Sequence, residues 1–341
     1  MFYVTSYPLA IGLCVVTMLG WGSWANTLKL APKGWEFPLY YWDYAVGLVL
    51  TALLFGFTFG SIGEQGRGFA ADLAQAGPAA LGGAFVGGVV FNLSNLLIVA
   101  ATAIAGMSVA FPIAVGLALV IGVVVNYLGD PVGDPYVLFG GTALVVVALL
   151  LNARAYAKLQ ASGGEADASG TAAPKSRGIA LALASGILMG FFYRFVADAM
   201  VSDFAAPEPG LLTPYSAMFV FTVGILASSL LFNVYFMRRP VTGEAVTFAD
   251  YRERGSTRTH LIGLAGGLIW CTAMEFNLVA AGAAGPAISY GLGQGATLVA
   301  ALWGVFVWRE FDGARDATRP LLAGMFACFV AGLALIVAAK S

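Results

Sequence analysis

The chain has 341 residues, of which 60% are hydrophobic and only 10% are charged. An ordinary soluble domain carries roughly 25% charged residues, so this composition excludes a water-soluble globular fold and favours a protein embedded in a bilayer. The net charge of −1 supplies no basic field for nucleic acid, and the three cysteines and single histidine lack the spacing of a disulfide framework or a zinc site. We therefore expect no nucleic acid, no metal and no cofactor.

Ten apolar segments follow one another along the chain, each about as long as the 20 residues that a helix needs to cross a bilayer. They lack the alternation that marks the strands of a membrane barrel, so we predict an all-α integral membrane protein. The first segment has no basic region before it and no clear cleavage site, which favours a first span over a cleaved signal peptide. The predicted spans cover residues 7–29, 37–60, 78–102, 107–128, 135–153, 178–197, 211–237, 259–281, 286–308 and 320–339.

The links between these spans differ in charge. Of the 17 lysines and arginines, 14 follow the first, fifth, seventh or ninth span. Cytoplasmic loops of membrane proteins carry an excess of Lys and Arg. We therefore expect these links in the cytoplasm, and a multi-pass protein of the cell inner (plasma) membrane with both termini outside the cytoplasm.

The link after the fifth span divides the chain into two halves. Its residues 161–176 are small and polar, as in a flexible tether. We assign residues 1–155 to a first five-helix repeat, 156–177 to a cytoplasmic linker and 178–341 to a second five-helix repeat. Because each half has five spans, the two halves must be inverted relative to each other. Inverted repeats around a site near the middle of the bilayer are an architecture of secondary transporters.

An internal similarity supports two repeats. The segment from Gly87 reads GGVVFNLSNLLIVAATAIAGMSVAF, and the segment from Gly266 reads GGLIWCTAMEFNLVAAGAAGPAISY, at an offset of 179 residues. Paired glycines, an alanine-rich exit and a tight turn at Gly106 and Gly285 coincide. The alternative interpretation is that two membrane helices rich in Gly and Ala look alike without being repeats.

Four polar residues lie within predicted spans, where a polar group is costly and asks for a reason. Asn95 lies in the middle of the third span, Glu275 in the eighth and Gln294 in the ninth, and Asn92 shares a helical face with Asn95. Asn95 and Glu275 are 180 residues apart, so they occupy nearly equivalent positions in the two repeats. We expect these groups to face one central cavity and to bind a neutral, hydrogen-bonding solute; hydrogen bonds between helices are the alternative for the amides.

The charged residues within the spans have separate expected roles. Glu275 could exchange a proton with each side of the membrane in turn and couple transport to protons; a packing bond or a plain substrate contact is the alternative. Arg194 and Asp198 are four residues apart on the sixth span and can pair. A structural pair is favoured there over an outer gate. Asp43 on the second span is expected to make a structural or gating bond.

Two tryptophans, Trp21 and Trp24, lie three residues apart on the first span and could stack on a planar ring. An interfacial position is the alternative for indole rings, most strongly for Trp24. Tyr290 is a further candidate for contact with the solute, with Phe191 and Tyr193 behind it, and core or lipid packing is their default role.

These residues, in this order, resemble the ureide permease family of the drug/metabolite transporter superfamily. The similar motifs are WGSWANTL, YYWDY with FTFGSIG, SNLL, NYLGD, AMEF, GQG and ALWG, and they cover most of the chain outside residues 155–178. The resemblance implies ten helices in two inverted halves around a central cavity, and uptake of oxo-heterocycles such as allantoin or uracil with protons. It also implies that Trp24, Asp43, Asn95 and Gln294 match recurring family residues. The chain departs at Glu275, where plant members have Gln.

The sequence thus predicts a secondary active transporter of a small heterocyclic metabolite, ureide or nucleobase-like, that works by alternating access. Its expected partners are the small-molecule substrate, the lipid bilayer, a proton or sodium ion as co-substrate, and a second copy in a homodimer. A sugar transporter or a metabolite and drug exporter of the same superfamily is the alternative. A membrane enzyme lacks paired carboxylates or a metal-spaced set of ligands, and a channel lacks a visible charge ring or filter.

Overall fold

A computed structural model describes residues 1–162, 175–241 and 243–340, which form helices and connecting loops with one isolated bridge between Met200 and Leu212. Ten of its helical segments are long and apolar enough to cross a membrane, which confirms the predicted all-α fold of ten spans. In chain order the helices are α1 (Tyr7–Ser23), α2 (Asn26–Lys29), α3 (Phe37–Phe57), α4 (Phe69–Gln75), α5 (Pro78–Ala105), α6 (Met107–Gly129), α7 (Pro135–Ala161), α8 (Lys175–Ala199), α9 (Pro214–Arg238), α10 (Phe248–Arg254), α11 (Thr257–Ala284), α12 (Pro286–Gly293), α13 (Ala296–Leu302), the π turn η1 (Trp303–Val307), the 3₁₀ turn η2 (Asp312–Ala314) and α14 (Arg315–Ala338).

The predicted boundaries hold to within a few residues, with one larger difference at the fifth span. The helix α7 continues to Ala161, well beyond the predicted end at 153. Arg154 and Lys158 ended the apolar run, but a helix does not stop where it leaves the hydrocarbon. Most helices begin at a proline in their first turn, where the missing N–H costs nothing. The predicted tether at 161–176 lies largely outside the described residues.

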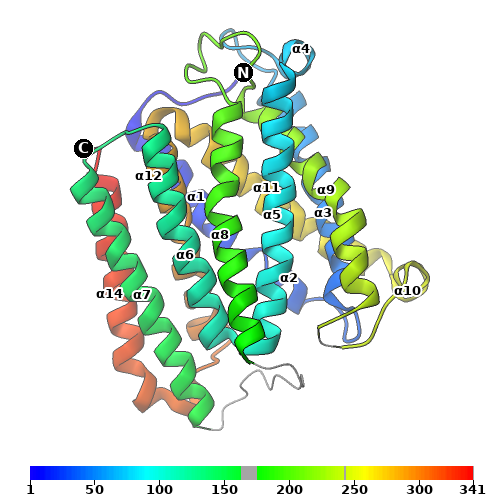
Figure 1. The fold of residues 1–341 in the computed structure, drawn as a ribbon, viewed down its shortest axis with the longest axis vertical. Helices are drawn as coiled ribbons and strands as arrows, with labels where there is room; N and C mark the ends of the chain where they lie inside the picture. Colours follow the sequence, from blue (N-terminus) through cyan, green and yellow to red (C-terminus); the bar gives the residue numbers. More distant parts are fainter. Residues whose placement is uncertain (163–174, 242, 341) are drawn as a thin grey trace.

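The long helices run side by side along one axis, and the two termini lie at the same end of the bundle (Figure 1). The short helix α4 lies at this end, while α10 and the end of α7 lie toward the opposite end. This opposite end carries the links with most of the basic residues. An even number of spans requires both termini on one side, and the bundle meets that requirement.

The helices α5 and α11 match each other in length and position. Each has 28 residues, and an offset of 179 relates both their starts and their ends. Each ends at a glycine with positive φ, Gly106 at +83° and Gly285 at +88°, and the next helix starts at once. A residue with a Cβ is strained in this region of φ, so glycine is what allows the tight hairpin in both halves.

The packing of these two helices also corresponds. A Cβ on Gly88 of α5 would lie 2.0 Å from the Phe221 carbonyl oxygen on α9, and one on Gly267 of α11 would lie 2.3 Å from that of Tyr44 on α3. More widely, α5 packs on α8 and α9 as α11 packs on α1 and α3. The remaining pairs, α7 with α14 and α3 with α9, join the two halves. These correspondences support the inverted repeats, which stay a prediction, as does a homodimer.

Two spans are interrupted where they pass the middle of the bundle. The first changes from α1 to α2 at Trp24–Ala25, and the ninth from α12 to α13 at Gln294–Gly295. At both places the backbone tightens to bonds between residues three apart, such as Thr27 N to Trp24 O at 3.0 Å and Thr297 N to Gln294 O at 3.2 Å. Irregular backbone at membrane depth is tolerated where it borders a cavity.

Candidate functional site

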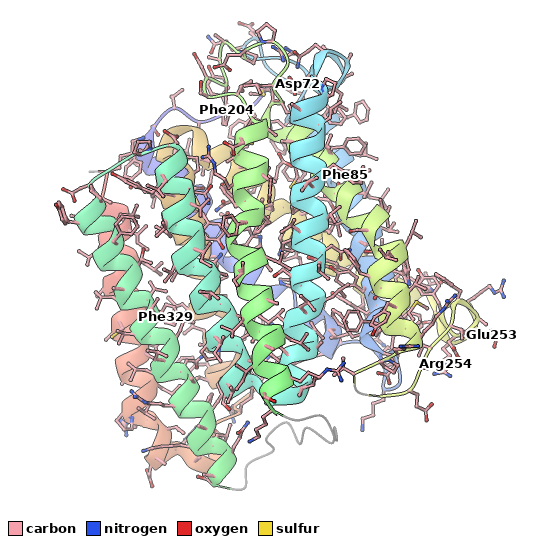
Figure 2. All side chains as sticks on the ribbon, viewed as in Figure 1. Asp72, Phe85, Phe204, Glu253, Arg254 and Phe329 are labelled. Atoms are coloured by element: carbon pink, nitrogen blue, oxygen red, sulfur yellow. The ribbon has the colours of Figure 1, made fainter. Side chains whose placement is uncertain are left out.

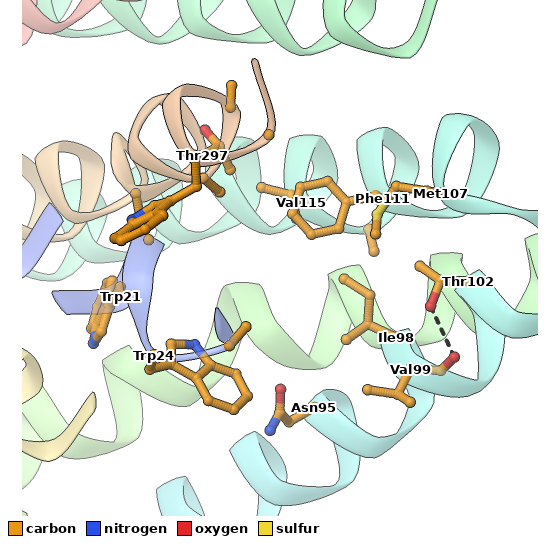
Figure 3. A pocket seen from close by; sticks show the side chains of 18 of the residues that line it. Trp21, Trp24, Asn95, Ile98, Val99, Thr102, Met107, Phe111, Val115 and Thr297 are labelled. Atoms are coloured by element: carbon orange, nitrogen blue, oxygen red, sulfur yellow. Dashed lines mark hydrogen bonds between the residues drawn. The ribbon is translucent and has the colours of Figure 1, made fainter. Parts of the chain in front are cut away.

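A cavity of about 560 Å³ lies between the helices and includes both interruptions in its wall. Figure 3 shows Trp21, Trp24 and Thr297 toward one side of it and Phe111 and Met107 toward the other. Most of the wall is aromatic or aliphatic, with a few polar side chains among them. This is the usual composition of a small-molecule site, where apolar contact gives affinity and a few polar groups fix orientation.

Asn95 on α5 contributes a carboxamide whose direction is held from behind. Its Nδ2 donates to the Tyr41 hydroxyl at 3.2 Å, and that hydroxyl donates to Asn92 Oδ1 at 2.9 Å. Asn95 lines the cavity beside Trp24 (Figure 3). The side chain therefore has one end anchored in the protein, and its amide faces the cavity ready for a ligand.

Asn92 lies one turn earlier on α5 but does not line this cavity. Its Nδ2 lies 2.7 Å from Ser228 Oγ, 3.2 Å from Ser229 Oγ and 3.2 Å from the Ile225 carbonyl oxygen, all on α9. Together with its bond from Tyr41, Asn92 connects α3, α5 and α9. It positions Asn95 through Tyr41 rather than facing the solute.

Trp21 and Trp24 both line the cavity, as the stacking prediction requires. Trp21 stacks on Trp270 with ring centroids 5.8 Å apart, and Trp24 packs on Tyr44 at 4.8 Å. Packing of one ring face fixes each indole, and Trp21 Nε1 has no hydrogen-bond partner among the described residues. The two rings form a preorganised apolar surface next to Asn95.

Gln294 lines the same cavity from the break between α12 and α13. Within the described part of the chain its side chain has no hydrogen bond, while its carbonyl oxygen accepts from Thr297 Oγ1 at 2.9 Å. The interruption of the ninth span thus supplies a second carboxamide to the hollow that Asn95 borders. The predicted meeting of Asn95 and Gln294 is what the structure shows.

A cluster of aromatic rings closes the deep end of the cavity. Phe91 packs on Trp270 at 4.6 Å and on Phe192 at 5.2 Å, and Phe192 packs on Phe221 at 5.8 Å. Phe91 and Trp270 are themselves 179 residues apart, so the equivalent helices of the two halves touch here. Of the described residues that line the cavity, none belongs to the links 58–77, 130–134 or 200–213.

The opposite end of the cavity is polar and includes residues at the basic end of the bundle. Lys29 Nζ donates to Glu310 Oε1 at 3.0 Å, and the Tyr156 hydroxyl donates to Glu310 Oε2 at 2.9 Å. Trp308 Nε1 donates to Asn26 Oδ1 at 2.7 Å, and Lys29 lies over the Trp308 ring. The sequence gave little sign of this mouth, because Lys29 and Glu310 fall in links where charges are usual.

Glu275 does not line the cavity, in contrast to the expectation of one hollow shared with Asn95 and Gln294. It is fully buried, and neither carboxyl oxygen has a hydrogen-bond partner among the described residues. The helix ends are offset by 179 rather than 180, which pairs Asn95 with Met274. Trp270 of α11 faces the cavity, and five residues further a helix has turned by about 140°. Glu275 therefore points away from the hollow.

Tyr290 is also buried outside the cavity wall. Its hydroxyl lies 3.1 Å from the Ala118 carbonyl oxygen and 3.2 Å from that of Met189, so it joins α12 to α6 and α8. Tyr193 packs on its ring at 5.3 Å, while Phe191 is exposed on the outside of α8. These contacts are those of core and lipid packing, which were the default roles.

The remaining charged candidates lie away from the cavity. Arg194 and Asp198 form the expected salt bridge on α8. Asp43 accepts from the Tyr251 hydroxyl on α10 and lies 3.0 Å from His260 Nδ1 on α11, so it ties the link helix to the bundle. Burial, followed by the Asp43 carboxyl, raises the pKa of Tyr251. The described residues contain no group of three or more His, Cys, Asp or Glu that could hold a metal ion.

Comparisons with known proteins agree with this architecture. The sequence model of the family described as ureide permease matches residues 40–168 and 170–339. Ureide permease 2 from Arabidopsis thaliana is 26% identical over 403 residues, covering 100% of this chain and 99% of its own. Ureide permease 1 of the same plant is 25% identical over 397 residues with the same coverage. The probable ureide permease A3 from Vigna unguiculata is 32% identical over 165 residues, which is 47% of this chain and 44% of that protein.

A solved crystal structure of a protein is similar to this fold with a TM-score of 0.56 at 16% identity, over 98% of this chain and 99% of that one. At this identity the similarity concerns the fold alone. The match to the family model extends over nearly all of the chain, and the resemblance seen in the motifs is confirmed. The chain is a multi-pass membrane protein of a permease family, which indicates a transporter rather than an enzyme. It belongs to the ureide permease family.

Proposed function

We propose that this protein is a secondary transporter of ureides or similar nucleobase-like heterocycles. Its plant relatives are named ureide permeases, and they align along the whole chain. The observation that carries the proposal is that two indoles, Trp21 and Trp24, and two carboxamides, Asn95 and Gln294, border one hollow. A ureide ring is flat and carries alternating C=O and N–H groups, so it matches both kinds of surface.

The deep part of the cavity suits a neutral ligand. The only charged side chains in its wall are Lys29 and Glu310, which pair with each other at the mouth. Stacking on an indole face contributes apolar area at fixed geometry. The amides of Asn95 and Gln294 would each complement one C=O or N–H of the ring, and a ligand that leaves a buried amide unpaired would bind less tightly.

Alternating access is the mechanism that this architecture favours. The cavity reaches the end of the bundle with the basic links, which the positive-inside rule places in the cytoplasm, with both termini outside. Its other end is closed by the rings of Phe91, Phe192, Phe221 and Trp270. We infer an inward-facing state of a plasma-membrane protein, in which rocking of the halves would open the opposite end.

Glu275 is the residue we propose for proton coupling, although it lies outside the cavity. A charged carboxylate is very costly to bury without a partner, and both of its oxygens lack one among the described residues. We infer that the side chain carries a proton in this state. It would exchange that proton when the outer half of the bundle opens. Sodium coupling is the alternative that the transport assay resolves.

Tracer uptake into proteoliposomes tests the proposal. Allantoin, uracil and glucose are supplied in parallel, with inward proton or sodium gradients imposed separately. We expect allantoin or uracil to accumulate with the proton gradient, and an ionophore that collapses the gradient to abolish accumulation. Accumulation of glucose alone would contradict the ureide proposal and favour the sugar alternative. Accumulation driven only by sodium would contradict proton coupling.

A further inference from the structure

The cavity is larger than one small ring requires. Its volume of about 560 Å³ equals the space of roughly 19 water molecules at about 30 Å³ each. A single ureide stacked on Trp24 beside Asn95 would leave the part nearer the mouth unfilled. That part has its own polar side chains, which come from other elements than those of the deep site.

These side chains form a continuous polar strip. Asn152 and Tyr156 are four residues apart on α7, so they share one helical face, and both line the cavity. Tyr156 donates to Glu310 Oε2 at 2.9 Å, and Lys29 donates to Glu310 Oε1 at 3.0 Å. The strip, defined as Lys29, Asn152, Tyr156 and Glu310, thus combines an amide, a hydroxyl, a carboxylate and an ammonium group.

Asn152 has hydrogen-bonding capacity that the described protein does not use. Only 8% of the residue is exposed, and its Oδ1 has no partner among the described residues. A buried amide left unpaired is costly, so such groups ask for an explanation. Asn126 and Asn233 also have an unpaired Oδ1, but each donates its Nδ2 to a backbone carbonyl and neither lines the cavity. The Asn152 amide is the one that a molecule in the cavity can satisfy.

We propose that Asn152, Tyr156 and the Lys29–Glu310 pair form a second ureide subsite at the mouth. A ureido group has a C=O next to an N–H, which pairs with both ends of the Asn152 amide. A further N–H of the ligand donates to Glu310, and a further C=O accepts from Lys29. This proposal rests on the proposed ureide function and adds a second bound position. A molecule leaving the deep site would stop here before it reaches the cytoplasm.

Equilibrium binding of radiolabelled allantoin to the purified full-length protein in lipid nanodiscs tests the second subsite. Wild type is expected to bind two molecules per chain, one more tightly than the other. Asn152→Ala is expected to weaken only the weaker site, by roughly three- to tenfold, as for the loss of one hydrogen bond. Asn126→Ala is the matched control and is expected to leave both sites unchanged.

Glu310→Gln is a second variant that keeps the size of the side chain. Glu310 is partly exposed at the mouth, so this change is compatible with folding, and we expect it also to weaken only the weaker site. Asn95→Ala is expected to weaken the tighter one. Binding that saturates at one Asn95-dependent molecule per chain would overturn the subsite and leave the ureide function standing. Two sites that neither mouth variant changes would also overturn it, and no allantoin binding at all would overturn both proposals.

Discussion

At the scale of single residues, the function depends on how few side chains are free to meet a ligand. Most polar groups within the described spans have partners inside the protein, as Asn92 does with Tyr41 and Ser228. Asn95 differs because Tyr41 holds it from behind while its amide borders the cavity. The distinction between a packing amide and a binding amide is therefore one helical turn on α5.

We predict that Asn95→Ala raises the KM for uptake of the transported ureide by roughly three- to tenfold, because one hydrogen bond to the ring is lost. Initial uptake rates in proteoliposomes measure the effect. Asn233→Ala removes a buried amide that bonds Pro38 away from the cavity and serves as the control. Equal effects of the two variants would show that Asn95 acts through folding and not through binding.

Glu275→Gln keeps the shape of the side chain and removes its ability to exchange a proton. For the wild type, uptake is expected to increase as the outside pH falls, because protons enter with the solute. For the variant we expect downhill uptake that does not respond to pH and no accumulation. Glu253→Gln, on the outward-projecting α10 (Figure 2), changes a carboxylate far from the bundle core and is expected to behave as wild type. An unchanged pH response in Glu275→Gln rules out this coupling residue.

At the scale of elements, the sequence predicted the ten spans because apolar length reports directly on crossing a membrane. It also predicted the hairpin glycines, since the similar segments end at Gly106 and Gly285. The position of Glu275 was not predictable from that similarity alone. A shift of one residue in the offset rotates a helical side chain by about 100°, and only the helix ends fix the offset at 179. The mouth could not be found either, because Lys29 and Glu310 look like ordinary link charges.

The hairpin turn makes a stability prediction. Gly106→Ala places a Cβ at φ +83°, which costs about 1–2 kcal/mol in the left-handed region, although its surroundings leave room for a methyl group. We expect a lower midpoint of thermal unfolding in detergent. Gly140→Ala, within α7 and with nothing near its Cβ, is expected to be neutral or slightly stabilising. Similar midpoints for both variants would contradict the strain argument.

At the scale of the whole molecule, two five-helix halves with corresponding packing surround a hollow that is closed on one side. The interrupted first and ninth spans both lie against it, and they supply Trp24 and Gln294. Irregular backbone at these places allows local bending without loss of the surrounding helices. The architecture thus places the binding groups where the backbone can change direction.

The orientation of this hollow is testable with cysteine labelling. Thr102→Cys in the cavity wall is expected to react with a membrane-impermeant maleimide only from the cytoplasmic side, and Ser61→Cys in the link after α3 only from outside. Right-side-out and inverted vesicles separate the two cases. Cys14 and Cys271 are buried and Cys328 is replaced by serine as background. Labelling of position 102 from the outside alone would reverse the assigned orientation.

The most direct measurement is a structure of the full-length protein in a lipid nanodisc with allantoin bound. The account predicts a flat ligand against Trp21 or Trp24, with its C=O and N–H groups within hydrogen-bonding distance of Asn95 and Gln294. A ligand bound elsewhere in the bundle, or an allantoin-saturated protein with this hollow empty, would contradict it.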